Sequence, residues 1–353
     1  MNRVSVVGAG YTKFDEHWEK SLRDLSTEAG GLALADAGIE GSDVQALFVG
    51  NMSGGRFVGQ EHLGALAAEQ AGLLPIPAVR CEAACASGAT ALMAAISAIQ
   101  SGRYDIVVAA GAEKMTDIKG AGAIAALMGA GDQEWETQVG LTFTGLYALI
   151  ARAHMHQFGT TREQLALVSV TNHENGALNP KAQLPFKVSV RDVLESSLVA
   201  DPLTLLDCSP ITDGAAAVIL ASERVAKRFA NPVWVLGSGQ ASDTVALHAR
   251  KSLVELAATK VAARTAYEQA KLTAAGIDIA EVHDCFSINE VIAIEDLGFC
   301  KKGEGGKFVE RGGIRRDGEK PVNTLGGLKS IGHPVGATGI RQVCDLVSQL
   351  RGT

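Results

Sequence analysis

The sequence lacks three features that would place the protein in other classes. No apolar run approaches the roughly 18 residues that a membrane-spanning helix needs. The opening MNRVSVVGAG leads directly into a strand-like segment and a glycine turn, which is not the pattern of a signal peptide. The net charge of −7 argues against a surface that binds nucleic acid or membrane headgroups.

The cysteine pattern of a disulfide-bonded secreted domain is also missing. The six cysteines are spread through a long chain rather than concentrated in a short one. We therefore predict a cytoplasmic location, where a reducing environment leaves thiols available for chemistry. These cysteines are Cys81, Cys85, Cys208, Cys285, Cys300 and Cys344.

Nucleotide-binding signatures are incomplete. The segment GAGYTK (8–13) begins like a dinucleotide-binding turn, but Lys13 occupies the position of the third glycine. No clear acidic residue closes the next strand, and no G-K-[ST] phosphate loop occurs in the chain. The sequence therefore gives little support to either kind of nucleotide site.

Glycine, by contrast, is abundant, at 40 of 353 residues, which is about 11% against a typical ~7%. This excess predicts tight turns and close backbone approaches. Apolar β-type runs alternate with helix-type patterns, as is typical of α/β layering. The predicted strands cover 5–9, 46–50, 105–112 and 216–220, and the predicted helices cover 21–38 and 87–102, with Gly38 and Gly102 as helix stops.

The order of these segments repeats in the second part of the chain. PVWVLGSGQ (232–240) resembles the opening VSVVGAG, and a helical run at 252–270 matches the helix at 21–38. AGIDIAEVHDCFSIN then parallels AGIEGSDVQALFVGN, and HPVGAT parallels CASGAT. Four matched segments in the same order indicate an internal duplication. The last match aligns Cys85 with His333, Gly88 with Gly336 and Thr90 with Thr338.

We therefore divide the chain into three parts. Residues 1–114 with 206–230 form the first half, and residues 231–353 form the second. Residues 115–205 form a glycine-rich, polar insertion that we expect to be a lid or substrate-binding excursion. In the first half a strand pair follows the last helix, whereas the second half stops at QLRGT. By symmetry, either carboxy-terminal strands are missing or the second half is closed differently.

Cys85 and His333 each lie in a small-residue turn before a helix. Backbone N–H groups at a helix start favour negative charge, so we predict that the pKa of the Cys85 thiol is lowered and that it is a nucleophile. A pseudo-twofold arrangement of the halves would bring both turns into one pocket. The alternative is that Cys85 is a small core residue and His333 a hydrogen-bonded turn histidine.

A third candidate element is HDCFSINE (283–290), which follows the strand-like IAEV. Functional loops of α/β sheets lie at that end of a strand. His283 and Cys285 are two residues apart, so on a continuing strand they would face the same side. An imidazole and a thiol there can stabilise an oxyanion and move protons. The alternative is that Cys285 is merely buried.

The same side chains permit a second interpretation, a zinc site. The C-x₃-C and H-x-C spacings fit no common structural zinc pattern, and no second C-x-x-C pair is present. Thiol chemistry is therefore the better-supported interpretation. The ligands of such a zinc site would be Cys81, Cys85, His283 and Cys285.

Several motifs together resemble the thiolases. CEAACASG, HDCF, GGLKSIGHPVGATG, NPKAQ and SPITDGAAAVIL are similar to the sterol-carrier-protein type and the archaeal-style acetoacetyl-CoA thiolases, in which HDCF replaces the NEAF of ordinary thiolases. The similarity covers essentially the whole chain. It implies a five-layered αβαβα packing of two halves, a loop domain near 115–205, and a homodimer or tetramer. It also implies an acyl-CoA substrate and no metal or redox cofactor.

The resemblance assigns a role to each candidate residue. Cys85 would take an acyl group from acyl-CoA as a thioester, and His333 would activate Cys85 and help to bind the thioester oxygen. Cys285 would remove or return the α-proton of the second acyl unit, and His283 would share an oxyanion hole with His333. Ordinary thiolases also carry a CxG motif near the carboxy terminus, which this sequence lacks after His333. Loss of one oxyanion-hole donor costs a factor of roughly 10²–10³ in rate.

Two alternatives within the same fold stay open. A decarboxylating ketosynthase would also use a cysteine at a helix start, but it lacks an acid/base thiol like Cys285. A thiolase-like subunit could instead bind acyl-CoA or hold partners without turnover. The resemblance implies two such partners, a hydroxymethylglutaryl-CoA synthase and a small zinc-ribbon OB-fold protein, with which the archaeal-style relatives associate.

Overall fold

The computed structural model describes residues 2–353, which divide into two compact units. Each unit is assembled from segments that are distant in sequence, so neither corresponds to one half of the duplication. The three-part division drawn from the sequence stays a prediction. Unit 1 comprises Met1–Ala123, Ile211–Leu236 and His333–Thr353, and unit 2 comprises Ile124–Pro210 and Gly237–Gly332.

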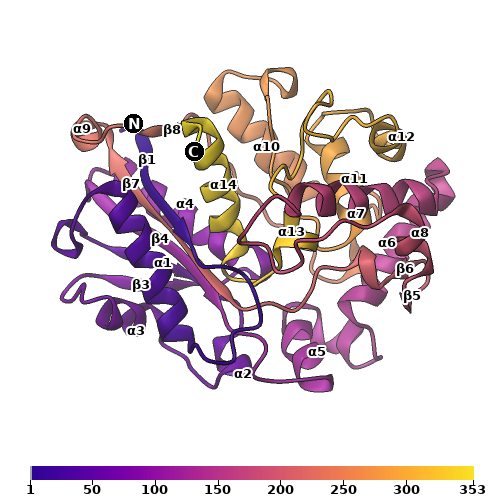
Figure 1. The fold of residues 1–353 in the computed structure, drawn as a ribbon, viewed down its shortest axis with the longest axis horizontal. Helices are drawn as coiled ribbons and strands as arrows, with labels where there is room; N and C mark the ends of the chain where they lie inside the picture. Colours follow the sequence, from indigo (N-terminus) through magenta and orange to yellow (C-terminus); the bar gives the residue numbers. More distant parts are fainter. Residues whose placement is uncertain (1) are drawn as a thin grey trace. The chain divides into compact units, whose positions relative to one another are not determined.

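Unit 1 contains the strands and helices of an α/β layer (Figure 1). Its strands are β1 (Val4–Tyr11), β2 (Leu47–Gly50), β3 (Ala78–Cys81), β4 (Ile106–Glu113), β7 (Gly214–Ser222) and β8 (Val233–Val235). Its helices are α1 (Leu22–Ala37), α2 (Gly54–Phe57), α3 (Leu63–Gln70), α4 (Ser87–Gln100), α9 (Glu223–Ala226) and α14 (Thr338–Arg351), and α5 (Ala121–Leu127) spans the boundary of the two units.

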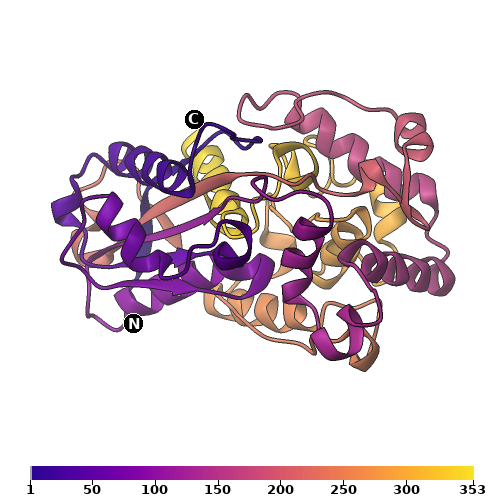
Figure 2. The same ribbon diagram turned by 90° about the horizontal axis from the view of Figure 1, so that it is seen from below.

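The strands of unit 1 form one mixed sheet in the order β3-β2-β4-β7-β1-β8. β2 pairs in parallel with β3 and β4, whereas β7 runs antiparallel to both β4 and β1. All nine residues of β7 are buried, so helices must cover both faces of the sheet. α1 and α3 pack on one face, and α4 and α14 cover the other. Figure 2, the view from below, shows helices on either side of the strands of unit 1.

Helix α1 illustrates how closely local sequence sets these boundaries. Ser21 and Asp24 form a reciprocal capping box at its start, and Gly38 ends it in the left-handed conformation (φ +66°). The helix predicted at 21–38 is therefore confirmed. The strands predicted at 5–9, 46–50, 105–112 and 216–220 are also confirmed, as β1, β2, β4 and β7.

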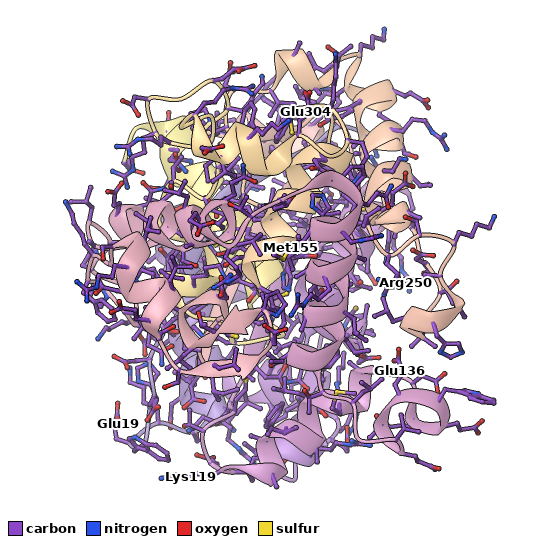
Figure 3. All side chains as sticks on the ribbon, turned by 90° about the vertical axis from the view of Figure 1, so that its right-hand side faces the viewer. Glu19, Lys119, Glu136, Met155, Arg250 and Glu304 are labelled. Atoms are coloured by element: carbon purple, nitrogen blue, oxygen red, sulfur yellow. The ribbon has the colours of Figure 1, made fainter. Side chains whose placement is uncertain are left out.

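Unit 2 is mainly helical and has its own hydrophobic core. Helix α11 is buried along nearly its whole length and packs against α6 and α7. Glu136, labelled in Figure 3, is buried and accepts the N–H of Leu247 at 2.5 Å. The elements are α6 (Phe143–Phe158), α7 (Arg162–Gly176), α8 (Val190–Glu195), β5 (Leu198–Ala200), β6 (Leu203–Thr204), α10 (Ala257–Ala270), α11 (Ser287–Asp296), α12 (Gly305–Glu310) and α13 (Gly327–Ile331).

The insertion predicted at 115–205 contributes helices to the core of unit 2, and its role as a lid or substrate-binding excursion stays a prediction. Its helices α6 and α7 place Leu165 and Val168 in the hydrophobic core of unit 2, both without exposed surface. Among residues 2–353, no helix is both long and apolar enough to cross a membrane.

The second sheet expected from the duplication is not formed among the described residues. β8, which should open it, instead pairs with β1 and extends the first sheet at its edge. The segment around Ala280 makes only a single bridge, to Val322. An isolated strand leaves its backbone groups unpaired, so each segment takes the partner within reach. The α/β fold is confirmed, with one mixed sheet between two helical layers in unit 1, and the five-layered αβαβα arrangement of two halves stays a prediction.

Three glycines allow unusually close backbone contacts in unit 1. A methyl group at Gly111 of β4 would lie 2.1 Å from the carbonyl oxygen of Gly336, and one at Gly88 of α4 would lie 2.7 Å from the same oxygen. The turn that contains Gly336 therefore rests directly on the strand and on the helix start. Side chains at these positions would push the three segments apart.

We predict that Gly111→Ala destabilises the protein by at least about 2 kcal/mol, because a backbone oxygen cannot move aside as a side chain can. The free energy of unfolding in urea measures the effect. Gly30→Ala is the matched control, since no atom lies within 4 Å of a methyl group at this α1 position. It should be neutral or stabilise by about 0.5–1 kcal/mol, and equal losses in both variants would contradict the role of close packing.

Candidate active site

Cys85 lies in a 3₁₀ turn (Ala84–Ala86) that leads directly into α4. The buried Ser87 hydroxyl fixes this turn by accepting the Ala83 N–H at 3.0 Å and donating to the Ala84 carbonyl at 2.7 Å. Ala84 has φ +50°, a left-handed conformation that costs a residue with a side chain about 1 kcal/mol. The turn thus holds the thiol at the start of the helix, as the sequence predicted.

His333 lies between α13 and α14 and is buried. Its backbone N–H donates to the Thr212 hydroxyl at 2.9 Å. Its ring Nδ1 lies 2.7 Å from the Thr338 hydroxyl, which itself donates to the Pro334 carbonyl at 3.1 Å. Because that hydroxyl proton is used on Pro334, Nδ1 must be the donor to Thr338. The neutral ring therefore carries its proton on Nδ1, and Nε2 is the nitrogen that can accept another.

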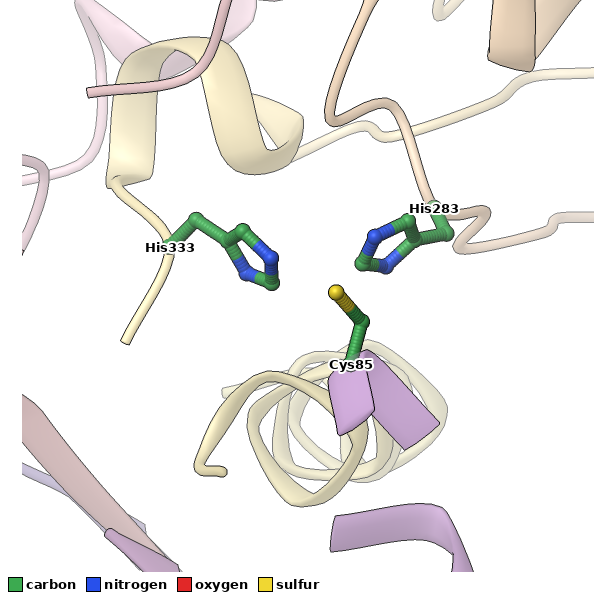
Figure 4. A group of neighbouring side chains, drawn as sticks. All are labelled: Cys85, His283 and His333. Atoms are coloured by element: carbon green, nitrogen blue, oxygen red, sulfur yellow. The ribbon is translucent and has the colours of Figure 1, made fainter. Parts of the chain in front are cut away.

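The structure brings Cys85 and His333 together within unit 1. The Cys85 sulfur and a ring nitrogen of His333 lie within 4.8 Å of each other. Figure 4 shows the His333 ring directed toward the sulfur. The duplication predicted this meeting of two turns that are far apart in the sequence. A thiol beside an imidazole is the arrangement that activates a cysteine by proton transfer.

The expected lowering of the Cys85 pKa is wrong. Burial, and after it the negative charge of Glu113, raise the pKa of the thiol to about 12, even though the hydrogen bond from its own backbone N–H lowers it in part. Cys85 as a whole residue is partly exposed, yet protein surrounds the thiol closely enough to disfavour a thiolate. A neutral resting thiol follows, so the proton must leave during the reaction and needs a nearby base.

His283 and Cys285 belong to unit 2, in the loop that precedes α11. This loop is not a continuing strand, so the argument that both side chains face the same side does not hold. His283 is partly exposed and Cys285 is buried. The Cys285 carbonyl accepts the Ser209 N–H at 2.9 Å, and the Phe286 ring stacks on Tyr147 at 4.5 Å between centroids. The loop is therefore well fixed, and the catalytic roles of both residues stay predictions.

A buried polar network beside this loop was missed in the sequence. The Asn172 side-chain amide donates to Asp284 and to Glu290, at 2.8 Å in each case, and Asn323 donates to Glu290 at 2.8 Å. Burial and the neighbouring Asp284 raise the pKa of Glu290 to about 8. Two carboxyl groups at such a short separation cannot both be ionised without a large electrostatic cost. The signal was available as acidic and amide residues within otherwise apolar helices.

The Asp284 carboxylate has a second task. It accepts the backbone N–H groups of Leu328, at 2.7 Å, and Lys329, at 3.2 Å, which are the second and third residues of α13. A carboxylate near the start of a helix is favourably placed. Asp284 therefore fixes the HDCF loop to the helix that precedes His333 in the chain.

Comparisons with known proteins identify the family to which the chain is similar. Sequence profiles described as "Thiolase, N-terminal domain" and "Thiolase C-terminal domain-like" match residues 4–224 and 239–353. The chain is 57% identical over 353 residues to the acetyl-CoA acetyltransferase of Methanothermobacter thermautotrophicus, covering 100% of this chain and 92% of that protein. It is 38% identical to sterol carrier protein 2 of Bos taurus over 99% of this chain and 67% of that protein. A solved structure described as "Ltp2-ChsH2(DUF35) aldolase" has a TM-score of 0.85 at 26% identity, covering 99% of this chain and 90% of that one.

The raised pKa of Cys85 predicts slow, strongly pH-dependent alkylation. Iodoacetamide modification should accelerate continuously from about pH 6 to about pH 9 without a plateau, because only the thiolate reacts. Peptide mass spectrometry separates Cys85 from the other cysteines, and Cys85→Ala gives the background. A plateau below about pH 8 would show that the thiol is already activated at rest.

Thr338→Val should release the His333 ring from its fixed tautomer. Valine keeps the shape but cannot accept the Nδ1–H, so the two neutral tautomers become mixed, and the protein loses about 1 kcal/mol of stability. Nitrogen NMR shifts of ¹⁵N-labelled histidine report the tautomer directly. Thr338→Ser is the matched control and should retain the Nδ1–H form; an unchanged spectrum in the valine variant would contradict the assignment.

Proposed function

The chain belongs to the thiolase family, and on that premise we propose that it is a CoA-dependent acyltransferase of the thiolase type. The reaction joins two acetyl units of acetyl-CoA by Claisen condensation, or cleaves a 3-ketoacyl-CoA in reverse, through an acyl-enzyme on Cys85. The observation that carries the proposal is the Cys85 thiol within 4.8 Å of the His333 ring. The full-length similarity to an acetyl-CoA acetyltransferase supports the acetyl substrate.

In the first step, the Cys85 sulfur attacks the thioester carbonyl and its proton passes to Nε2 of His333. The new carbon–sulfur bond forms as the bond to CoA breaks, and the proton is returned to the departing CoA thiolate. A thiol with a pKa of about 12 needs such a base. Thr338 supports the role because it holds the His333 proton on Nδ1.

In the second step, we assign Cys285 as the base that removes the α-proton of the second acetyl-CoA. The resulting carbanion attacks the acyl-enzyme carbonyl, which forms the carbon–carbon bond and frees the Cys85 sulfur. His283 would donate hydrogen bonds to the developing oxyanions, and His333 would join it while its Nε2 carries the proton taken from Cys85. The support is the HDCF motif itself and the firm anchoring of its loop through Asp284 and Phe286. No metal or redox cofactor is needed for either step.

We also propose a homodimer or homotetramer in a reducing cytoplasm, since the reaction requires a free Cys85 thiol. A small zinc-ribbon OB-fold partner and a hydroxymethylglutaryl-CoA synthase are the proposed associates. The solved neighbour supports assembly with a second component, because its description names ChsH2(DUF35) together with Ltp2.

Incubation with acetyl-CoA should add one acetyl group to Cys85, detected by intact-protein and peptide mass spectrometry. Cys85→Ala should show no adduct. A folded wild-type protein that never acquires the acetyl group would favour the alternative function, a non-catalytic acyl-CoA-binding or scaffold subunit.

Cys285→Ala should still form the acetyl-enzyme but lose acetoacetyl-CoA formation by at least about 10²-fold, since a catalytic base contributes roughly 10²–10⁴. Cys300→Ala is the matched control, because it removes a partly buried thiol of the same unit outside the motif. Condensation at the wild-type rate by Cys285→Ala would remove Cys285 from the mechanism.

A further inference from the structure

Glu113, the last residue of β4, has no exposed surface, and N–H groups of the protein bind its carboxylate. Its two carboxylate oxygens are surrounded by N–H donors. Oε1 accepts the Asn51 side-chain amide at 2.9 Å and the Ser53 N–H at 3.0 Å, and Oε2 accepts the Met52 N–H at 2.8 Å and the Gly336 N–H at 3.0 Å.

These four bonds join two separate segments of unit 1. Residues 51–53 form the loop that follows β2, whereas Gly336 lies in the turn that contains His333. Backbone packing reinforces the junction, because a methyl group at Gly336 would lie 2.7 Å from the carbonyl oxygens of both Ala112 and Gly50. One buried carboxylate therefore adds a hydrogen-bonded anchor to the backbone packing that seats the His333 turn.

The same carboxylate also acts on the nucleophile through its charge. Its negative charge raises the pKa of the Cys85 thiol, while its own burial raises the pKa of Glu113 to about 7. The charged or titratable groups that interact with it are Arg80 from β3 and Cys85 from the start of α4. Arg80 donates hydrogen bonds to the backbone carbonyl groups of Asn51 and Met52, which lie in the same loop. Its positive charge favours the ionised form of Glu113 and so lowers the pKa of that carboxyl group in part.

We propose that Glu113 is a positioning residue for acyl transfer, which pins the His333 turn to the loop after β2 and opposes formation of a free Cys85 thiolate. The inference rests on the proposed function. Because Glu113 fixes the turn, the His333 ring stays near the sulfur. Because the charge of Glu113 disfavours a free thiolate, the Cys85 thiol transfers its proton to His333 only as the sulfur attacks a thioester. Glu113 thereby protects the resting thiol from stray electrophiles without weakening the base that activates it.

Glu113→Gln tests both parts of the proposal. Glutamine keeps the shape but removes the charge and places an NH₂ group among four N–H donors, so some donors lose their acceptor. The pH profile of Cys85 alkylation should shift down by about one unit, a roughly tenfold gain in thiolate at fixed pH. Acetylation by acetyl-CoA should fall by about tenfold or more, because the His333 turn loses its anchor. A general loss of structure would also expose the thiol and lower its pKa, so the result counts only if the far-UV circular dichroism and urea unfolding midpoint of the variant match those of the wild type.

Glu113→Asp separates the two effects and guards against a variant that fails to fold. It keeps the charge but is shorter by one methylene, so acetylation should fall while the alkylation profile stays at the wild-type pH. Glu61→Gln is the matched control. Glu61 is an exposed carboxylate that forms a salt bridge with Arg80 and is not part of the anchor of the His333 turn. This substitution should change neither measurement.

The outcomes distinguish this inference from the proposed function. Alkylation needs no acyl-CoA, so a Glu113→Gln profile identical to the wild type overturns the role of charge even in a chain that does not acylate. Acetylation of Glu113→Asp at the wild-type rate overturns the pinning role. A wild-type protein that fails to acetylate refutes the proposed function, whereas a shifted Glu113→Gln profile in that protein still supports the electrostatic role.

Discussion

The structure of unit 1 depends on one close backbone crossing, where the turn carrying His333 rests on β4 and on the start of α4. Gly88, Gly111 and Gly336 make the crossing possible because none of them has a side chain to hold the segments apart. Once the turn is seated, the His333 ring and the Cys85 sulfur are neighbours. Main-chain packing thus sets the distance between Cys85 and His333, and the surrounding side chains only adjust it.

Much of this could be predicted from the sequence, because the signals were local or repeated. Ser21 and Gly38 mark the ends of α1 by cap chemistry, and the alignment of Cys85 with His333 in a duplicated frame predicted their meeting. The missing second sheet could not be predicted, since strand pairing depends on which backbone partner lies within reach. The same applies to β8, whose sequence matches an opening strand but which extends the sheet beside β1.

The electrostatic error has a different origin. The helix start near Cys85 does supply a favourable backbone N–H, yet burial and the Glu113 charge outweigh it. Glu113 is 28 residues from Cys85 in the sequence, so no local pattern could show that its charge reaches the thiol. The acidic pair Asp284 and Glu290 shows the same limit, because Asn172, which joins them, comes from another helix. Local sequence predicts where a chain turns, whereas solvation of a charge depends on the whole fold.

The membership of α14 in unit 1 bears on how the protein is made. β1 pairs with β7 across more than two hundred residues, and Cys344 of α14 lies 3.6 Å from the Ala217 carbonyl of that sheet. During synthesis, the face of the sheet that α14 covers therefore stays exposed until this helix has been made, more than a hundred residues after β7. Contacts between such distant segments slow folding and leave apolar, aggregation-prone surface exposed in the nascent chain. We expect the sheet to reach its final packing only after α14 has emerged from the ribosome, with chaperones shielding that face until then.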